Sequence, residues 1–155
     1  MFVLPGYNLR PNEINGKIGL EQLKKIPKII NQRRKNAKIF RELFLNSEKV
    51  HIQKENDESS WFGFSIVLKG SLKDKRQYVL NKLKENRIET RPIISGNFLK
   101  FPVTKFMDFS VFGDLKNSNE VDANGFFIGN NHVNLERELN YFHEIIETIW
   151  QILKF

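Results

Sequence analysis

The first residues suited to chemistry come almost at the start of the chain, in the loop GYNLR (residues 6–10). Asn8 and Arg10 stand directly ahead of an expected helix start at Asn12. Amide and guanidinium donors beside the positive end of a helix dipole suit a phosphate or a carboxylate. A turn with a capping network has the same spacing, so the residues alone leave both interpretations open.

A second loop, ETRPIISGN (residues 89–97), places Arg91 at the end of an expected strand and continues through Gly96 to Asn97. An arginine followed by a glycine loop can hold an anionic or sugar-like group. The alternative is an edge-strand arginine whose strand is stopped by Pro92.

A third loop, GFFIGNNH (residues 125–132), brackets apolar residues between glycines and then presents Asn130 and His132. Glycines let a backbone pass close to a ligand. The alternative here is a buried strand followed by its turn.

Other chemistries have little support. The chain has no cysteine, which excludes disulfides and thiolate metal sites. It contains neither a G-x-S-x-G elbow nor a phosphate-binding G-x-x-x-x-G-K sequence. His51, His132 and His143 are scattered without metal-ligand spacing. The sequence therefore predicts no catalytic residue and no metal site in this chain.

The elements that must position these loops follow from the apolar pattern. Asn12 is the expected cap of a helical region that Pro27 divides into two. Ser71 is the expected cap of a middle helix that ends at Asn86 in a left-handed conformation. We expect helices at 12–46, 71–86, about 117–124 and 135–153, and strands at 50–52, 61–69, 88–91 and 125–129. The order predicts an α+β fold, with long N-terminal helices and further helices packed on a small, mostly antiparallel sheet.

Composition limits the function classes. With 155 residues, of which 40% are hydrophobic, the chain is expected to form one domain, residues 1–155, and not to be disordered. A formal charge of +7 suits an anionic partner. No apolar run reaches the roughly 18 residues of a membrane span, so we expect no membrane partner. The absence of cysteine fits the cytoplasm.

Three stretches match a known pattern in order and spacing. GYNLRPNEINGKIGLEQL is similar to G-Y-N-x-R-x-x-x-x-x-A-A-x-G-x-x-Q-L. RIETRPIISGN and VFGDLKNSNEVDANGFFIGNNHVN are similar to two later segments of the same pattern. Together they resemble the DegT/DnrJ/EryC1/StrS family of pyridoxal-phosphate-dependent sugar aminotransferases. The forms R-P-I-x-x-G-N and G-D-L-x-N are most similar to the branch containing the CDP-4-keto-6-deoxyglucose 3-dehydrase.

This resemblance implies the small C-terminal domain of a fold type I enzyme that makes deoxy- or amino-sugars for lipopolysaccharide. The chain would lack the N-terminal domain with its cofactor lysine, so it would supply substrate-side and dimer-side residues without turnover of its own. Pyridoxal phosphate would bind the full-length parent, a homodimer acting on a nucleotide-sugar, and not this chain alone. The implied cofactor contacts are Asn8 and Arg10, and the implied substrate contacts are Tyr7, Arg91, Asn97, Asn130 and His132. Lys17 departs from the family, which has alanine there.

Two other functions stay open. The first is a stand-alone basic module for an anionic ligand or RNA, suggested by the charge and by Arg33-Arg34-Lys35. Strand periodicity counts against an RNA-reading sheet, because Phe62 and Phe64 would share one face while Trp61 points away. The second is an interaction role, because a domain without its neighbour would expose apolar surface and self-associate. A monomer in light scattering at high concentration would contradict self-association.

Overall fold

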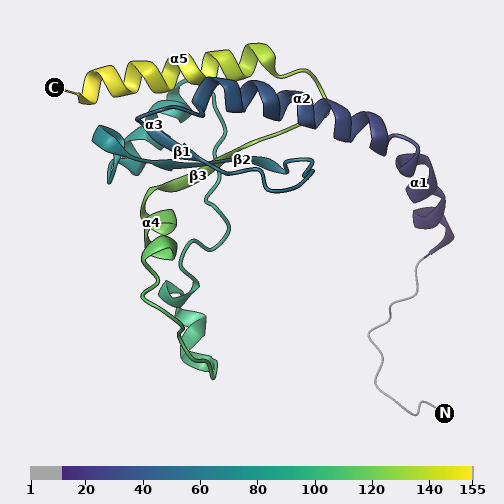
Figure 1. Ribbon diagram of the computed structural model, residues 1–155. Helices are drawn as coiled ribbons and strands as arrows, with labels where there is room; N and C mark the ends of the chain where they lie inside the picture. Colours follow the sequence, from purple (N-terminus) through teal and green to yellow (C-terminus); the bar gives the residue numbers. More distant parts are fainter. Residues whose placement is uncertain (1–11, 155) are drawn as a thin grey trace.

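A computed structural model describes residues 12–154, in which two long helices pack on one face of a small sheet (Figure 1). The helices are α1 (Glu13–Leu23), α2 (Ile26–Phe44), α3 (Arg76–Glu85), α4 (Lys116–Asn124) and α5 (Glu136–Leu153), and the strands are β1 (Val50–Ile52), β2 (Gly63–Leu68) and β3 (Gly125–Gly129). The expected α+β class is confirmed. None of the helices in this part of the chain has both the length and the apolar character of a membrane span.

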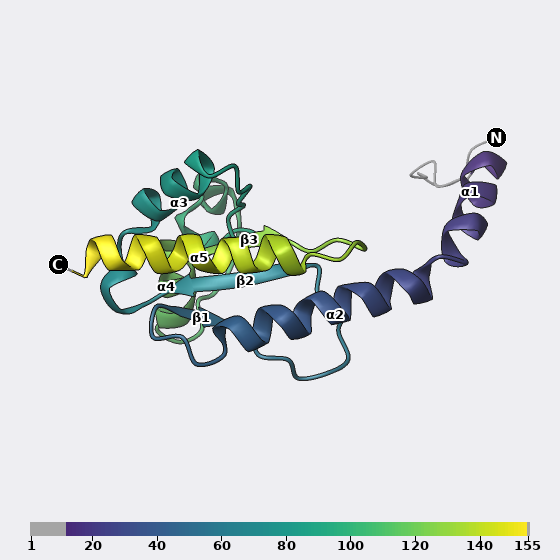
Figure 2. The same ribbon diagram turned by 90° about the horizontal axis from the view of Figure 1, so that it is seen from above.

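The sheet is antiparallel, with β2 between β1 and β3. Helices α2 and α5 lie side by side across one face and run in the same direction, with α3 beside α5 (Figure 2). Phe64, Ile66 and Leu68 are fully buried against these helices, while Ser65 and Val67 between them are only half-buried. This period of two makes one face of the sheet the core and leaves the other face available for a site.

Aromatic rings form the centre of the core. The Phe40 ring of α2 stacks on Phe64 of β2 with centroids 4.5 Å apart. Phe44, one turn further along α2, packs against Phe142 of α5 at 5.5 Å. All four side chains are at most 2% exposed. The rings therefore join the two long helices to the central strand.

The two N-terminal helices begin as expected, but the first does not pack on the core. The Asn12 side chain caps α1 by accepting a hydrogen bond from the Asn15 amide at 2.9 Å, and Pro27 lies in the first turn of α2. Yet Ile14 and Ile18 are 70% and 55% exposed. Helix α1 extends away from the sheet and has no buried residue, so its apolar side chains contribute nothing to the core (Figure 1).

The predicted start of the middle helix was wrong, whereas its predicted end at Asn86 is confirmed because Asn86 is the C-cap residue. Ser71 lies in a short 3₁₀ turn (Gly70–Leu72), because the left-handed conformations of Gly70 and Asp74 interrupt the chain there. The helix starts only at Arg76, and the Ser71 hydroxyl is buried without a hydrogen-bond partner in the described residues. At the other end, Arg87 and not Asn86 takes the left-handed conformation, with φ of 59°.

The predicted strands around the site were too long. The strand expected over 88–91 is reduced to one bridge between Arg91 and Phe127, because residues 88–90 make no ladder hydrogen bonds with β3. Strand β2 begins at Gly63 instead of Trp61, because Trp61 has a positive φ of 53°.

Residues 92–115 form an arm that hangs below the sheet and is attached to α4 at its base (Figure 1). Two short 3₁₀ turns, Phe98–Lys100 and Pro102–Phe106, are its only helical parts. Lys100 Nζ lies 2.6 Å from Asp122 Oδ2 of α4. Gly96 takes a φ of +54° beside Asp122, and a Cβ there would lie 2.5 Å from Asp122 Oδ1. Glycine is therefore required where the arm meets α4.

Acid should weaken this attachment. Hydrogen bonding from Lys100 is the main cause that holds the pKa of Asp122 below its ordinary value. Desolvation, the next largest effect, raises this pKa, and the Asn97 amide and the Lys100 and Arg76 charges lower it further. A carboxyl whose pKa falls on folding stabilises the fold above its unfolded pKa, and this contribution is lost as the pH falls through the folded pKa. Because Lys100 is half exposed, we expect Asp122→Asn to cost under about 1 kcal/mol at pH 6. The cost should begin to decline near pH 4, the ordinary pKa of an aspartate, and should vanish below the lower pKa of the folded state.

Urea unfolding of Asp122→Asn and of the parent protein at several pH values measures this difference in the free energy of unfolding. A difference that does not depend on pH would contradict the assignment.

Candidate functional site

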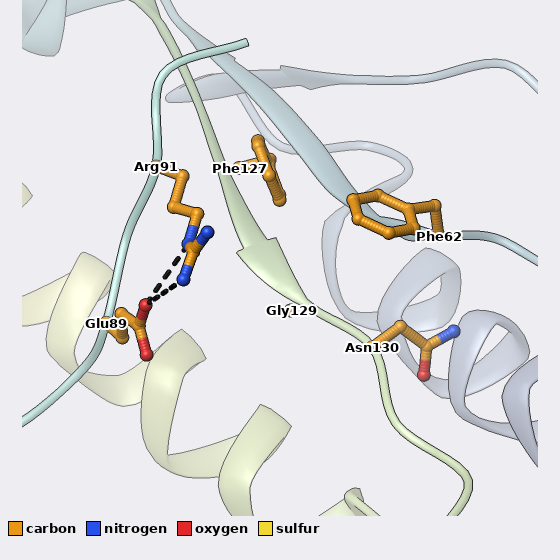
Figure 3. Close-up of a pocket in the computed structure, with 6 residues that line it drawn as sticks. All are labelled: Phe62, Glu89, Arg91, Phe127, Gly129 and Asn130. Carbon is orange, nitrogen blue, oxygen red and sulfur yellow. Dashed lines mark hydrogen bonds and ion pairs between the residues drawn. The ribbon is translucent and has the colours of Figure 1, made fainter. Parts of the chain in front are cut away.

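A hollow of about 370 Å³ opens on the face of the sheet away from α2 and α5. Its lining is drawn in Figure 3 and comprises Phe62, Glu89, Arg91, Phe127, Gly129 and Asn130. These residues come from the start of β2, from the segment before the arm, and from β3 and the turn after it. The site is thus assembled by the pairing of β2 with β3 and by the single bridge at Arg91.

Two aromatic rings form one wall. Phe62 and Phe127 have centroids 6.0 Å apart, and Phe62 is 80% exposed. The Phe127 ring covers Gly63, where a Cβ would lie 2.8 Å from the ring and 2.8 Å from the Ile128 carbonyl oxygen. At Gly129, by contrast, nothing lies within 4 Å of such a Cβ. The wall is therefore apolar, fixed by a glycine behind it and open in front.

An ion pair forms the opposite side. Glu89 and Arg91 are two residues apart in an extended segment, so their side chains point the same way. Arg91 Nε and Nη2 both donate to Oε1 of Glu89, at 3.2 and 3.0 Å. Within residues 12–154, no hydrogen bond reaches Oε2 of Glu89 or Nη1 of Arg91. The pair thus offers the hollow an acceptor and a donor side by side.

Asn130 closes the end of the hollow, but its amide is committed to the protein. Its Nδ2 donates to the carbonyl oxygens of Arg33 and Trp61 at 3.1 and 3.0 Å. The Arg33 guanidinium donates twice to the same Trp61 oxygen, at 3.2 and 2.6 Å. These three donors hold Trp61 in its left-handed conformation, and Phe62 follows directly. The amide therefore positions the aromatic wall.

Asn36 of α2 holds the turn that carries Asn130. Its side chain is fully buried, and Nδ2 lies within 3.1 Å of three oxygens: Asn130 Oδ1, the Asn131 carbonyl and the Val133 carbonyl. Its Oδ1 accepts from Gln32 Nε2 at 3.0 Å and from the Leu135 amide at 3.3 Å. One buried amide on α2 thus fixes the chain from the end of β3 to the start of α5.

The structure brings together some of the residues predicted from sequence and separates others. Arg91 and Asn130 share the hollow. Asn97 is 7% exposed at the base of the arm, where it bonds Asn119 Oδ1 at 2.8 Å. His132 lines a separate hollow of about 320 Å³ with Lys25 and Lys28. Tyr7, Asn8 and Arg10 lie outside the described residues, and the substrate and cofactor roles of all seven stay predictions.

Four lining residues were not among the predicted site residues: Phe62, Glu89, Phe127 and Gly129. The spacing of Glu89 from Arg91 could have identified the carboxylate, since alternate residues of an extended segment share a side. Phe62 carried no such signal, because its position depends on the conformation of Trp61. In the part of the chain that the structure describes, the hollow included, no three histidine or carboxylate side chains gather as a metal site would require.

Comparison with known proteins decides the family. The sequence profile of the DegT/DnrJ/EryC1/StrS aminotransferase family matches residues 2–144. This chain belongs to that family.

Members of the 3-dehydrase branch are among its relatives. GDP-4-keto-6-deoxy-D-mannose 3-dehydratase of Yersinia pseudotuberculosis is 47% identical over 147 residues, which are 94% of this chain and 37% of that enzyme. Lipopolysaccharide biosynthesis protein RfbH of Salmonella typhimurium is 30% identical over 127 residues, 80% of this chain and 29% of that protein. The predicted family and branch are thus confirmed.

Solved structures agree with the sequence relatives. The E. coli GDP-4-keto-6-deoxy-D-mannose-3-dehydratase with bound hydrated pyridoxal phosphate, and a mutant of ColD with bound GDP-perosamine, each superpose with a TM-score of 0.87 at 45% identity. Each match covers 94% of this chain and 38% of the other. The chain therefore spans under two fifths of these relatives, in their C-terminal region. Of the two predicted activities, aminotransferase or dehydrase, these relatives are named for the second, and aminotransferase is supported only by the family name.

Proposed function

We propose that this DegT/DnrJ/EryC1/StrS family member acts as the small C-terminal domain of a GDP-sugar 3-dehydratase in the synthesis of lipopolysaccharide deoxysugars. It would work with a pyridoxal-phosphate domain and supply one wall of the nucleotide-sugar site. The observation that carries the proposal is the match to GDP-4-keto-6-deoxy-D-mannose 3-dehydratase, which covers 94% of the chain at 47% identity. The hollow lined by residues between 62 and 130 adds to it.

The hollow does not by itself fit pyridoxal phosphate. None of its six lining residues is a lysine that could react with the cofactor aldehyde, and none is a histidine that could act as an acid or a base. Its one cation, Arg91, is paired with Glu89, whose carboxylate would repel a phosphate. The cofactor contacts of the proposal therefore remain Asn8 and Arg10 with groups of the cofactor domain, and the hollow is assigned to the substrate.

The exposed apolar side chains are consistent with a domain that packs against neighbouring domains or subunits. Phe106 and Phe112 on the arm are 88% and 98% exposed, and Leu20 on α1 is 58% exposed. Such surface favours association in water. We propose that the cofactor domain and a second subunit cover it, which also explains why α1 and the arm stand clear of the core.

An RNA-binding module is less well supported. Trp61 and Phe64 are buried in the core, so only Phe62 and Phe127 offer rings on the open face. The single arginine beside them is neutralised by Glu89. RNA-reading sheets instead combine exposed rings with unpaired basic side chains.

A hybrid enzyme tests the proposed function. The C-terminal region of the E. coli dehydratase that matches this chain would be replaced by residues 2–155. The hybrid should bind pyridoxal phosphate, seen by visible absorption, and remove the 3-hydroxyl of GDP-4-keto-6-deoxymannose. The unmodified enzyme is the positive control. A hybrid that holds the cofactor but leaves the GDP-sugar unchanged would contradict the proposal.

A further inference from the structure

We infer that Asn15 is a site of spontaneous deamidation, because it precedes Gly16 in a helix that has no buried residue. The chain has a second Asn-Gly pair, Asn124-Gly125, and the fold protects that one. Since the two dipeptides are identical, only the structure distinguishes their reactivity. The inference stands apart from the proposed function, because it depends on the chain's own helix α1.

The reaction is an intramolecular ring closure. The backbone nitrogen of Gly16 loses its proton and attacks Cγ of Asn15, so that a C–N bond forms and the Cγ–Nδ2 bond breaks to release ammonia. Water then opens the five-membered succinimide by cleaving one of its two carbonyl–nitrogen bonds, which gives aspartate or isoaspartate. The net change replaces an amide by a carboxylate and needs no oxidant or reductant. Asparagine is for this reason counted among the thermolabile residues.

Helix α1 opens at low cost. Ring closure needs a backbone ψ at the asparagine that an α-helix does not provide, so the first turn must unfold before the reaction. The helix has 11 residues, fewer than the about 12–15 below which isolated helices are marginal in water. It contains Gly16 and Gly19, and each glycine weakens a helix relative to alanine. Figure 2 shows α1 extending away from the sheet, where no core packing opposes its opening.

Short-range bonds hold the reacting pair. The Gly16 amide donates to the Asn12 carbonyl oxygen at 3.2 Å, and the Asn15 amide donates to Asn12 Oδ1 at 2.9 Å. The Asn15 side chain itself is exposed. Opening of a single turn breaks both bonds and frees the glycine nitrogen, which has no neighbouring side chain to hinder its attack.

The second pair lies at the junction of α4 and β3 and is held from several sides. Asn124 is fully buried, its Oδ1 accepts from the Asp74 amide at 2.6 Å, and its Nδ2 donates to Glu120 Oε1 at 3.1 Å. The Gly125 amide donates to the Val121 carbonyl oxygen. Opening here would separate α4 from the loop before α3 and disturb the pairing of β3 with β2. The open population at Asn124 is therefore far smaller than in α1.

Deamidation would change the surface that α1 presents. Aspartate keeps the helical backbone and adds a negative charge. Isoaspartate inserts a methylene group into the main chain, which displaces the regular i→i−4 hydrogen bonds of the helix. The reaction is thus an ageing process that alters α1 while leaving the core intact.

Incubation of the full chain at mildly alkaline pH, followed by peptide mass mapping, tests the inference. The rate at each site follows its open population when opening is fast. We expect Asn15 to react at least about a hundredfold faster than Asn124, the ratio given by a difference of about 2.8 kcal/mol in opening free energy. In urea, where neither helix persists, the two rates should become similar. Equal rates in the native chain, or an Asn15 that keeps its amide there after the unfolded chain has reacted, would overturn the inference.

Two glycine variants separate the attacking residue from the helix that carries it. Gly16→Ala places a methyl group beside the attacking nitrogen and also stabilises the helix, whereas Gly19→Ala only stabilises the helix. Apart from the helix's own backbone, nothing lies within 4 Å of a Cβ at either position, so both variants should fold. Gly19→Ala should slow the reaction by no more than about fivefold, the effect of one glycine on the open population. Gly16→Ala should slow it further, and equal rates in the two variants would refute attack by Gly16.

Discussion

Replacing Asn36 by aspartate should destabilise the fold by about 3–5 kcal/mol, the cost of an uncompensated buried charge. The change keeps the size of the side chain but replaces the Nδ2 donor with a carboxylate oxygen. That oxygen would face Asn130 Oδ1 and the carbonyls of Asn131 and Val133, all at about 3 Å. Because Asn36 is fully buried, water cannot relieve the repulsion.

Urea unfolding followed by tryptophan fluorescence at pH 7 measures the cost of Asn36→Asp. Asn81→Asp is the matched control, because Asn81 is exposed on α3 and accepts only a surface hydrogen bond from Gln77. We expect the control to stay within about 0.5 kcal/mol of the parent protein. If both variants lost the same stability, the buried network would not be what holds the turn after β3.

The sequence predicted some elements of the fold correctly and missed others, for physical reasons that differ. The long helices α2 and α5 were expected correctly, because burial of one face gives them a sustained apolar period. The short strand β3 was expected correctly from an apolar run between two glycines. Short-range backbone conformations were not. Gly70 and Asp74 displaced the start of α3, and Trp61 displaced the start of β2.

The location of the site followed from sequence only where residues are close in the chain. The pairing of Arg91 with Glu89 depends on local spacing. By contrast, the contact of Asn36 with Asn130 joins residues 94 positions apart, and no local pattern in one sequence reports it. Asn130 was predicted as a substrate contact, yet its side-chain amide donates hydrogen bonds within the protein, to the carbonyl oxygens of Arg33 and Trp61. These partners are also distant in sequence, so no local pattern reports them.

Phe62 shows most clearly how one backbone angle redirects a side chain. An uninterrupted strand from Trp61 would put Phe62 and Phe64 on the same face. Instead Trp61 turns through a φ of 53°, so that Trp61 and Phe64 are buried while Phe62 is exposed. The three hydrogen bonds to the Trp61 carbonyl hold this turn. The core thus gains a tryptophan, and the hollow gains a ring that the fold does not need.

This difference in burial predicts very different costs for the same substitution, phenylalanine to alanine, at two positions. Phe40→Ala should cost about 3–5 kcal/mol, the range for truncating a buried phenylalanine. The Phe40 ring is fully buried, stacks on Phe64 at 4.5 Å and meets Trp61 edge-on at 6.5 Å, so its loss leaves a cavity between α2 and β2. Phe62→Ala should change the free energy of unfolding by no more than about 0.5 kcal/mol.

Urea unfolding of both variants beside the parent protein measures this contrast. Similar costs for the two changes would mean that Phe62 is part of the core and that its exposure has another cause. The predicted contrast would instead allow Phe62→Ala to be tested in the hybrid enzyme. A variant that folds as stably as the parent and still loses turnover of the GDP-sugar must have lost a contact to the ligand, and this separation of stability from function is what a ring kept outside the core should show.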